Sequence, residues 1–156
     1  MALKVGDTAP SFRLPSTDGK SFNSEDIKEP LVLFFYPKDF TPGCTKEACS
    51  FRDHFSFFKE LDIQVYGIST DTISKHLKFK KAHDLPFDLL SDPAGSVCKL
   101  YKAHVPILNI AKRVTYLIDS KKKIAASYSD LLGAGKHIKA MISKVRKANP
   151  EADHLP

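Results

Sequence analysis

The sequence predicts an α/β protein with a mixed central sheet and helices on both faces. Residues 31–36 (LVLFFY) are six consecutive apolar residues stopped by Pro37, which is typical of a strand buried on both of its faces. In the segment that follows, apolar residues recur at helical spacing. Short apolar segments and helical segments continue to alternate along the chain, which indicates helices packed on one sheet.

The first half of the chain contains the clearest elements. Asp18-Gly19 is a hairpin turn signal between two short apolar segments, and residues 24–28 are expected to form a short helical turn. The spacing predicts a helix over 45–61, and residues 63–69 (IQVYGIS) predict the next strand. The helix has one apolar face, made by Ala48, Phe51, Phe55 and Phe58.

The second half continues the alternation and ends in a hairpin and a helix. A helix is predicted over 73–82, with Ile73 and Leu77 as its apolar residues, followed by a short strand over 87–90. Ser91-Asp92-Pro93 predicts the start of another helix, because proline is favoured in a first helical turn. The remaining predicted elements are a hairpin over 114–118 and 124–128 and a last helix over 135–147. We expect a single domain over 1–148 and a polar C-terminal tail over 149–156.

Composition limits the classes of protein to which the chain can belong. With 156 residues, of which 42% are hydrophobic and 27% charged, it has the size and make-up of one soluble domain. The net charge is +6, but the lysines are spread out and the phenylalanines fall at core-like spacing, so we expect no nucleic acid partner. A run of about 18 apolar residues and a secretory signal are both missing, so we expect no membrane association. Three cysteines are too few for a disulfide-stapled secreted protein, which favours the cytoplasm.

The chemistry is concentrated in residues 36–53, between the buried strand and the first long helix. In α/β folds, ligands bind at the carboxyl ends of strands, which is where this segment lies. Cys44 is expected at the helix start, where unpaired N–H groups and the helix dipole stabilise a thiolate. The Thr41 hydroxyl is three residues away and can reach the same pocket, while Pro37, Pro42 and Gly43 stiffen and shape the loop.

Other reactive chemistries fit these residues less well. A Cys–His hydrolase needs a histidine beside its cysteine, but His54 lies ten residues after Cys44, about 15 Å along the helix axis. The cysteine spacing does not match a zinc site, so no metal is expected. A thiol–disulfide oxidoreductase would carry C-x-x-C rather than the observed C-x-x-x-x-C. It remains an alternative function, as does a redox-sensing binding protein without catalytic turnover.

The same segment resembles the active-site signature of the peroxiredoxins, whose spacing is matched by Pro37-x-x-x-Thr41-x-x-Cys44. The longer string from Thr41 to Cys49 (TPGCTKEAC) is similar to the peroxiredoxin Q subfamily, also called bacterioferritin comigratory protein. Further similar pieces follow in order at residues 5–10, 67–71, 89–92 and 113–119, so the resemblance covers nearly the whole chain.

The resemblance implies a thioredoxin-like fold and a thiol peroxidase that needs no metal or organic cofactor. Cys44 would be the peroxidatic cysteine, Thr41 and Arg113 would bind the hydroperoxide and steady the thiolate, and Pro37 would shield the site. Cys49 would be the resolving cysteine, closing a Cys44–Cys49 disulfide that a thioredoxin-like partner reopens. The subfamily also favours a monomer.

Two positions elsewhere complete these expectations. Lys102 follows Tyr101 where the subfamily usually has a glycine, in a loop expected near the pocket. Cys98 lies among apolar residues of a helical segment and is expected to be a buried bystander.

Helix geometry adds a requirement for movement. Two residues five apart in an intact helix have Cα atoms roughly 8.6 Å apart, whereas a disulfide needs roughly 4.4 to 6.8 Å. Cys44 and Cys49 therefore cannot join while the helix stands, and we expect residues 41–50 to unwind after Cys44 is oxidised.

Overall fold

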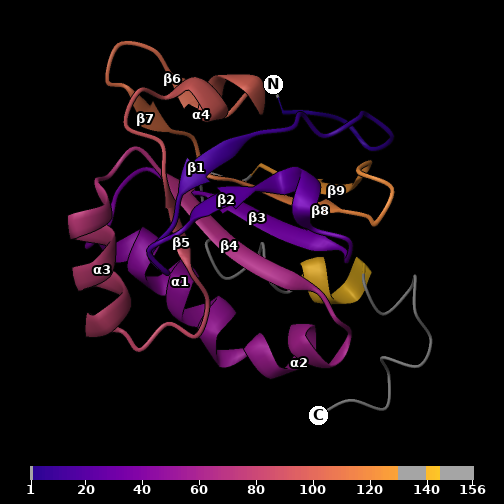
Figure 1. Cartoon of the computed structure of the whole chain (residues 1–156), viewed down its shortest axis with the longest axis horizontal. Helices are drawn as coiled ribbons and strands as arrows, with labels where there is room; N and C mark the ends of the chain where they lie inside the picture. The colour runs from indigo at the N-terminus through magenta and orange to yellow at the C-terminus, as the bar shows by residue number, and fades with distance from the viewer. Residues whose placement is uncertain (1, 130–139, 145–156) are drawn as a thin grey trace.

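A computed structural model describes residues 2–129 and 140–144 of the chain (Figure 1). A five-stranded sheet with the order β5-β4-β3-β8-β9 lies at its centre. The strands are β3 (Leu31–Phe35), β4 (Gln64–Ser69), β5 (Leu89–Ser91), β8 (Val114–Ile118) and β9 (Ile124–Tyr128). Strands β3, β4 and β5 are parallel, whereas β8 is antiparallel to β3 and β9 to β8, so the sheet is mixed as predicted.

Strand β3 is the centre of the protein, and all five of its residues are buried. Val32 and Phe34 belong to one hydrophobic cluster and Leu33 and Phe35 to another, because successive side chains of a strand point to opposite faces. The prediction of a strand buried on both faces is confirmed.

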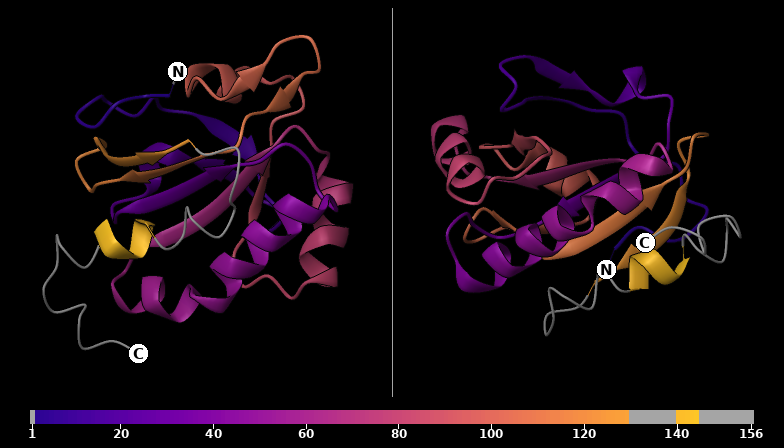
Figure 2. Two further views of the ribbon diagram at one scale, coloured as in Figure 1. Left: turned by 180° about the vertical axis from the view of Figure 1, so that it is seen from behind. Right: turned by 90° about the horizontal axis from the view of Figure 1, so that it is seen from below.

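One face of the sheet is covered by α1 (Pro42–Asp53) and α2 (Phe55–Glu60), which cross it diagonally (Figure 2). The prediction of one continuous helix over 45–61 was wrong, because the helix begins at Pro42 and is interrupted at His54 (φ −107°, ψ 10°). Both the His54 amide and its ring nitrogen Nδ1 approach the Ser50 carbonyl, at 3.2 and 2.9 Å, and this local contact accompanies the break. Phe51 and Phe58 are buried as predicted, whereas Phe55 is only partly buried.

Helix α3 (Ile73–Ala82) has the predicted bounds. Leu77 is 46% exposed, and the buried residues of the helix are His76 and Phe79. A buried histidine is the exception to the usual burial of apolar side chains, and its partners are described below.

The opposite face is covered by the hairpin β1 (Arg13–Pro15) and β2 (Ser21–Asn23), the turn η1 (Ser24–Asp26) and α4 (Ser96–Leu100) (Figure 1). The predicted Asp18-Gly19 turn joins β1 to β2. Helix α4 starts at Ser96, so the prediction that Pro93 lies in its first turn was wrong. Instead, Asp92 Oδ2 accepts a hydrogen bond from the Cys98 amide at 2.8 Å, and Gly95 enters the helix with φ 75°.

Two regions complete the chain. A short hairpin, β6 (His104–Val105) with β7 (Ile110–Ala111), was not predicted, because two-residue strands are too short to show a period. Of the predicted last helix, residues 140–144 are described and are helical; the rest of it and the tail 149–156 lie outside the described residues. In the part of the chain that is described, the structure holds no helix with the length and apolarity to cross a membrane.

Candidate active site

Cys44 lies in the first turn of α1, beyond the carboxyl end of β3. Thr41 is the N-cap residue with an extended backbone (φ −89°, ψ 149°), and Pro42 is the first helical residue. Proline suits that position because it has no N–H and a fixed φ. The Cys44 side chain is only 1% exposed, so its thiol is buried at the helix end where backbone N–H groups lack helical partners.

Arg113 reaches Cys44 because of the strand pairing. It directly precedes β8, whose first residue Val114 pairs with Phe35 at the carboxyl end of β3. Its Nη2 donates to Cys44 Sγ at 3.3 Å, across 69 residues of sequence. The structure therefore brings these two predicted site residues into direct contact.

Glu47 is a site residue to which the sequence analysis assigned no role. Its side chain is fully buried, and its Oε1 accepts from Arg113 Nη1 at 2.9 Å. Burial raises the pKa of Glu47 to about 7, although the Arg113 charge and hydrogen bond act to lower it. Glu47 lies on the inner face of α1 with Cys44 and Phe51. A charged residue at a position that the helical spacing assigns to the apolar face was therefore the sequence signal for it.

The guanidinium of Arg113 is held between two acidic groups. Burial lowers the pKa of Arg113, but the charges of Glu47 and Cys44 outweigh burial and raise it above its usual value. Gly43 provides the space, because a Cβ at this position would lie 3.0 Å from Arg113 Nη2. Arg113 is therefore fixed by its two partners and by the bare backbone beneath it.

Thr41 and Pro37 frame the loop that leads to Cys44. The Thr41 hydroxyl donates to the Lys38 carbonyl at 2.8 Å, which closes a tight turn before the helix. Pro37 lies two residues after the end of β3 and is partly exposed at the start of that loop. Both residues lie on the segment between β3 and Cys44, as expected.

The other two cysteines have different environments. Cys49 lies on the same helix, five residues after Cys44, and is partly exposed as a free thiol. Cys98 is a free thiol with no exposed surface, and burial, with the nearby Asp92 charge second, raises its pKa well above the usual value. A buried, protonated thiol is a poor nucleophile, which agrees with the expected bystander role.

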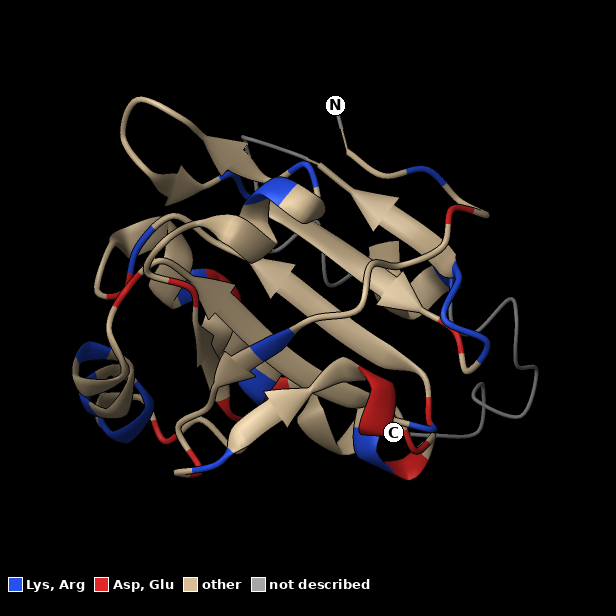
Figure 3. Ribbon diagram, turned by 45° about the horizontal axis from the view of Figure 1, so that its top comes forward, with Lys and Arg blue, Asp and Glu red and all other residues tan. Residues whose placement is uncertain are grey.

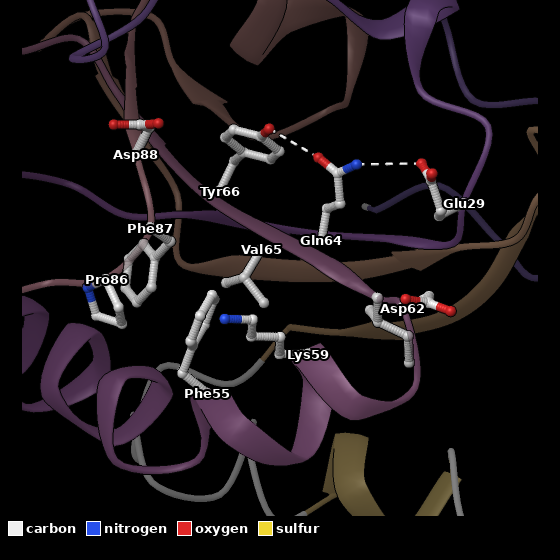
Figure 4. A pocket seen from close by; sticks show the side chains of 11 residues that line it. Glu29, Phe55, Lys59, Asp62, Gln64, Val65, Tyr66, Pro86, Phe87 and Asp88 are labelled. Carbon is white, nitrogen blue, oxygen red and sulfur yellow. Dashed lines mark hydrogen bonds between the residues drawn. The ribbon is translucent and has the colours of Figure 1, made fainter.

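A separate hollow lies at the other end of the sheet, at the start of β4 and in the segment before β5 (Figure 4). Phe55, Phe87 and Val65 form its apolar part, and Tyr66 donates to Gln64 along its side at 2.8 Å. Because β4 is parallel to β3, this end is opposite to the one that Cys44 follows. The hollow is therefore not part of the Cys44 site.

The distribution of charge agrees with the sequence analysis. Lys and Arg occur on several elements and are interspersed with Asp and Glu, with many of them on α3 (Figure 3). At the Cys44 site, the basic group in contact with the sulfur is the Arg113 guanidinium.

Comparison with known proteins places this geometry in a family. Residues 5–127 match the model of the AhpC/TSA family. The bcp protein of Coxiella burnetii is 39% identical over 152 residues, which cover 93% of this chain and 100% of that protein. The chloroplastic peroxiredoxin Q of Populus jackii is 40% identical over 138 residues, covering 87% of this chain but only 65% of the longer relative.

The fold comparison agrees with the sequence comparison. The crystal structure of peroxidoxin BcpB from Mycobacterium tuberculosis superposes with a TM-score of 0.87 at 35% identity, covering 93% of this chain and 97% of that one. The thioredoxin-like fold predicted from the sequence is thereby confirmed. The chain belongs to the AhpC/TSA family, on its Bcp and peroxiredoxin Q branch, and is a thiol-dependent peroxidase.

Proposed function

We propose that Cys44 is the peroxidatic cysteine and that Arg113 holds both its thiolate and the bound hydroperoxide. The observation that carries this proposal is the 3.3 Å contact between Arg113 Nη2 and Cys44 Sγ. A guanidinium remains charged at all relevant pH values and has several donors in a fixed plane, so it can donate hydrogen bonds to the sulfur and to a peroxide oxygen at the same time. The hydrogen bond that Arg113 Nη1 donates to Glu47 keeps the guanidinium plane oriented.

The first step is oxidation of Cys44 by the hydroperoxide. The thiolate attacks the terminal oxygen of ROOH, a sulfur–oxygen bond forms as the O–O bond breaks, and the alkoxide leaves and takes up a proton as ROH. Thr41 already donates its hydroxyl proton to the Lys38 carbonyl, so its oxygen is left to accept the O–H of the hydroperoxide. Pro37, at the start of the same loop, shields the site from water.

The second step is closure of an intramolecular disulfide. The Cys49 sulfur attacks the Cys44 sulfenic acid, a sulfur–sulfur bond forms, and the oxygen leaves as water. Both residues lie in α1, where the Cα–Cα separation of about 8.6 Å exceeds disulfide reach. The start of α1 therefore has to unwind between the two steps.

The third step returns the enzyme to its dithiol form with a thioredoxin-type dithiol as reductant. Two electrons pass from that dithiol to the Cys44–Cys49 disulfide by exchange through a mixed disulfide. Unwinding supports this step, because it moves Cys44 out of a site where it is 1% exposed.

The oligomeric state and the cellular compartment that we propose follow from the same cysteines. Both reacting thiols belong to one chain, so the cycle needs no second copy, and we assign a monomer. Three free thiols fit a reducing compartment, and we assign the cytoplasm.

A coupled assay with thioredoxin, its reductase and NADPH tests the proposal. Peroxide-dependent NADPH consumption is expected, whereas insulin reduction without peroxide turnover would indicate a thiol–disulfide oxidoreductase. Oxidation of the protein without turnover would indicate a redox sensor.

Three serine variants assign the roles in the same assay. Cys44→Ser is expected to be inactive, and Cys49→Ser to consume one equivalent of peroxide and then stop as the sulfenic acid. Cys98→Ser is the matched control and should turn over like the unmodified protein, since Cys98 is buried away from the site. Full activity in Cys44→Ser would overturn the assignment.

A further inference from the structure

A second cluster of buried polar side chains lies at the carboxyl ends of β3, β4 and β5. Tyr36, Asp39 and His76 are 1%, 2% and 0% exposed. Tyr36 and Asp39 belong to the segment that connects β3 to α1, whereas His76 lies on α3. None of the steps above uses these residues, although the cluster adjoins the segment that carries Cys44.

His76 connects two elements through its two ring nitrogens. Nδ1 lies 2.6 Å from Asp39 Oδ2, and Nε2 lies 3.0 Å from the Leu90 carbonyl oxygen. Because a carbonyl only accepts, Nε2 is the donor to Leu90, and Nδ1 faces the Asp39 carboxylate. His76 therefore ties the β3–α1 segment to the end of β5.

Asp39 is also fixed from other directions. The Tyr36 hydroxyl donates to Asp39 Oδ1 at 2.6 Å. The backbone amide of Asp39 donates to Asp71 Oδ2 at 2.8 Å. Asp71 in turn accepts from the Ser69 hydroxyl at 2.6 Å and pairs with Lys75 at 3.2 Å. Both carboxylate oxygens and the amide of Asp39 are thus occupied by bonds within the protein.

Asp71 is a stable anchor at neutral pH. Burial acts to raise the pKa of Asp71, but the Ser69 hydroxyl, the Asp39 amide and Lys75 outweigh burial and hold it below its usual value. One carboxylate oxygen each of Asp39 and Asp71 and one ring nitrogen of His76 lie within 4.8 Å of one another. These side chains form hydrogen bonds within the cluster and to the neighbours named above. The cluster is therefore a hydrogen-bonded anchor for residue 39.

The backbone changes character directly after this anchor. Phe40 has φ 65°, a left-handed conformation that is unfavourable for a residue with a side chain. Its ring is 48% exposed and touches Phe79 of α3 edge-on, with centroids 5.1 Å apart. Thr41 then caps α1. A strained residue thus separates the fixed residue 39 from the helix that carries Cys44, and such strain persists only where the surroundings enforce it.

We propose that His76 is a positioning residue of the peroxidase reaction, which acts through Asp39 to fix the end of the segment that unwinds. While the bond between them holds, opening begins at Phe40, and the folded site with Cys44 against Arg113 is favoured over the unwound state. When the bond is lost, residues 37–39 join the opening segment, so that the helix start unwinds more often. The proposal rests on the proposed function, because it assumes that closing the Cys44–Cys49 disulfide requires α1 to open.

Two substitutions of His76 separate its two bonds. In His76→Asn, the side-chain amide takes the place of Nδ1 and keeps the bond to Asp39 while losing the bond to Leu90. In His76→Gln, the amide reaches the place of Nε2 and keeps the bond to Leu90 while releasing Asp39. Asparagine is one methylene smaller than glutamine and leaves the larger space in the core, so a packing defect alone would favour opening in His76→Asn, which is the reverse of the expected order. His76→Asn is therefore the control for His76→Gln, and their melting temperatures report the structural cost of each.

The measurements are amide hydrogen exchange of the reduced protein and rapid-quench mass spectrometry after one equivalent of hydrogen peroxide. We expect His76→Gln, but not His76→Asn, to exchange residues 37–43 about tenfold faster than the unmodified protein. We expect the same variant to form the disulfide about tenfold faster and to react more slowly with peroxide. A general loss of structure would also accelerate exchange in β3 and β4, so acceleration confined to residues 37–43, together with these two rate changes, indicates positioning.

A smaller perturbation keeps the test decisive if both substitutions impair folding. Tyr36→Phe removes only the hydroxyl that donates to Asp39 Oδ1, and it should accelerate exchange over 37–43 by a smaller factor. Equal exchange in the two His76 variants, with no acceleration in Tyr36→Phe, would overturn the proposal. Exchange is read on the reduced protein, so a missing Cys44–Cys49 disulfide would overturn the proposed function separately.

Discussion

The buried carboxyl group of Glu47 makes a quantitative prediction about stability and pH. Its pKa is about 7 in the folded protein, against 4.5 for an exposed glutamate. The folded-state pKa is thus the higher one, so the stability that this group contributes is fully present below about pH 4.5 and is lost as the pH rises to about 7. A shift of this size corresponds to about 3 kcal/mol of unfolding free energy.

Glu47→Gln isolates this contribution. Glutamine keeps the size of the side chain and an oxygen that can accept from Arg113, but it cannot ionise. We expect unfolding by urea, with the thiols kept reduced, to show that the variant gains about 3 kcal/mol relative to the unmodified protein between about pH 4.5 and pH 8. Glu60→Gln is the control, because Glu60 is exposed on α2 and its removal should leave the pH profile unchanged.

The opposite outcome would refute the reasoning. If Glu47→Gln instead became less stable than the unmodified protein as the pH rises, the attraction of Arg113 would outweigh the cost of burying the charge. A difference that does not change with pH would mean that Glu47 keeps one protonation state throughout this range.

Three further substitutions test single contacts. Arg113→Lys should slow the peroxide step about 100-fold in rapid-quench assays, because an ammonium lacks the planar fork that presents separate nitrogens to Glu47 and Cys44; an unchanged rate would contradict the assigned role. Gly43→Ala should slow the same step about tenfold without lowering the melting temperature, since the new Cβ would lie 3.0 Å from Arg113 Nη2 and push the guanidinium aside; equal rates would show that Arg113 adapts. Lys102→Gly should stabilise the protein by about 1 kcal/mol in urea unfolding, whereas Lys102→Ala should not, because Lys102 follows the C-cap residue of α4 with φ 54°; a gain in both would refute strain as the cause.

Lys102 also shows how a departure from the subfamily pattern becomes visible in the structure. The sequence places a lysine where a glycine is usual, and the backbone there is left-handed (φ 54°). The Lys102 amide bonds to the Lys99 carbonyl at 3.0 Å and the Ala103 amide to the Cys98 carbonyl at 2.8 Å, which is the helix ending that favours glycine. The loop therefore keeps the glycine conformation, and the lysine bears the strain.

Local patterns predicted the elements that make up the central layer. Strand β3 was predictable because six apolar residues followed by a proline leave few alternatives, and the place of Cys44 in a first helical turn because Thr, Pro and Gly precede it. The break at His54 was not predictable, because the apolar spacing continues across it from Phe51 to Phe55 and Phe58.

Contacts between distant segments were beyond local patterns. Arg113 was assigned by resemblance, and only the pairing of Val114 with Phe35 explains why it meets Cys44. The pair of Asp39 and His76 joins residues 37 positions apart, and no local pattern indicates that the two side chains meet. Polar residues on an apolar helix face, such as Glu47 and His76, were the signal that could have identified both buried clusters.

The central claim is that the start of α1 has to unwind for Cys44 and Cys49 to form a disulfide. Amide hydrogen exchange over residues 41–52, compared between the reduced protein and the protein oxidised with one equivalent of hydrogen peroxide, tests it most directly. Mass spectrometry of the same samples confirms the bond. The account predicts that protection over these residues falls sharply on oxidation while β3 and β4 stay protected. Unchanged protection in a sample with a verified Cys44–Cys49 disulfide would contradict it.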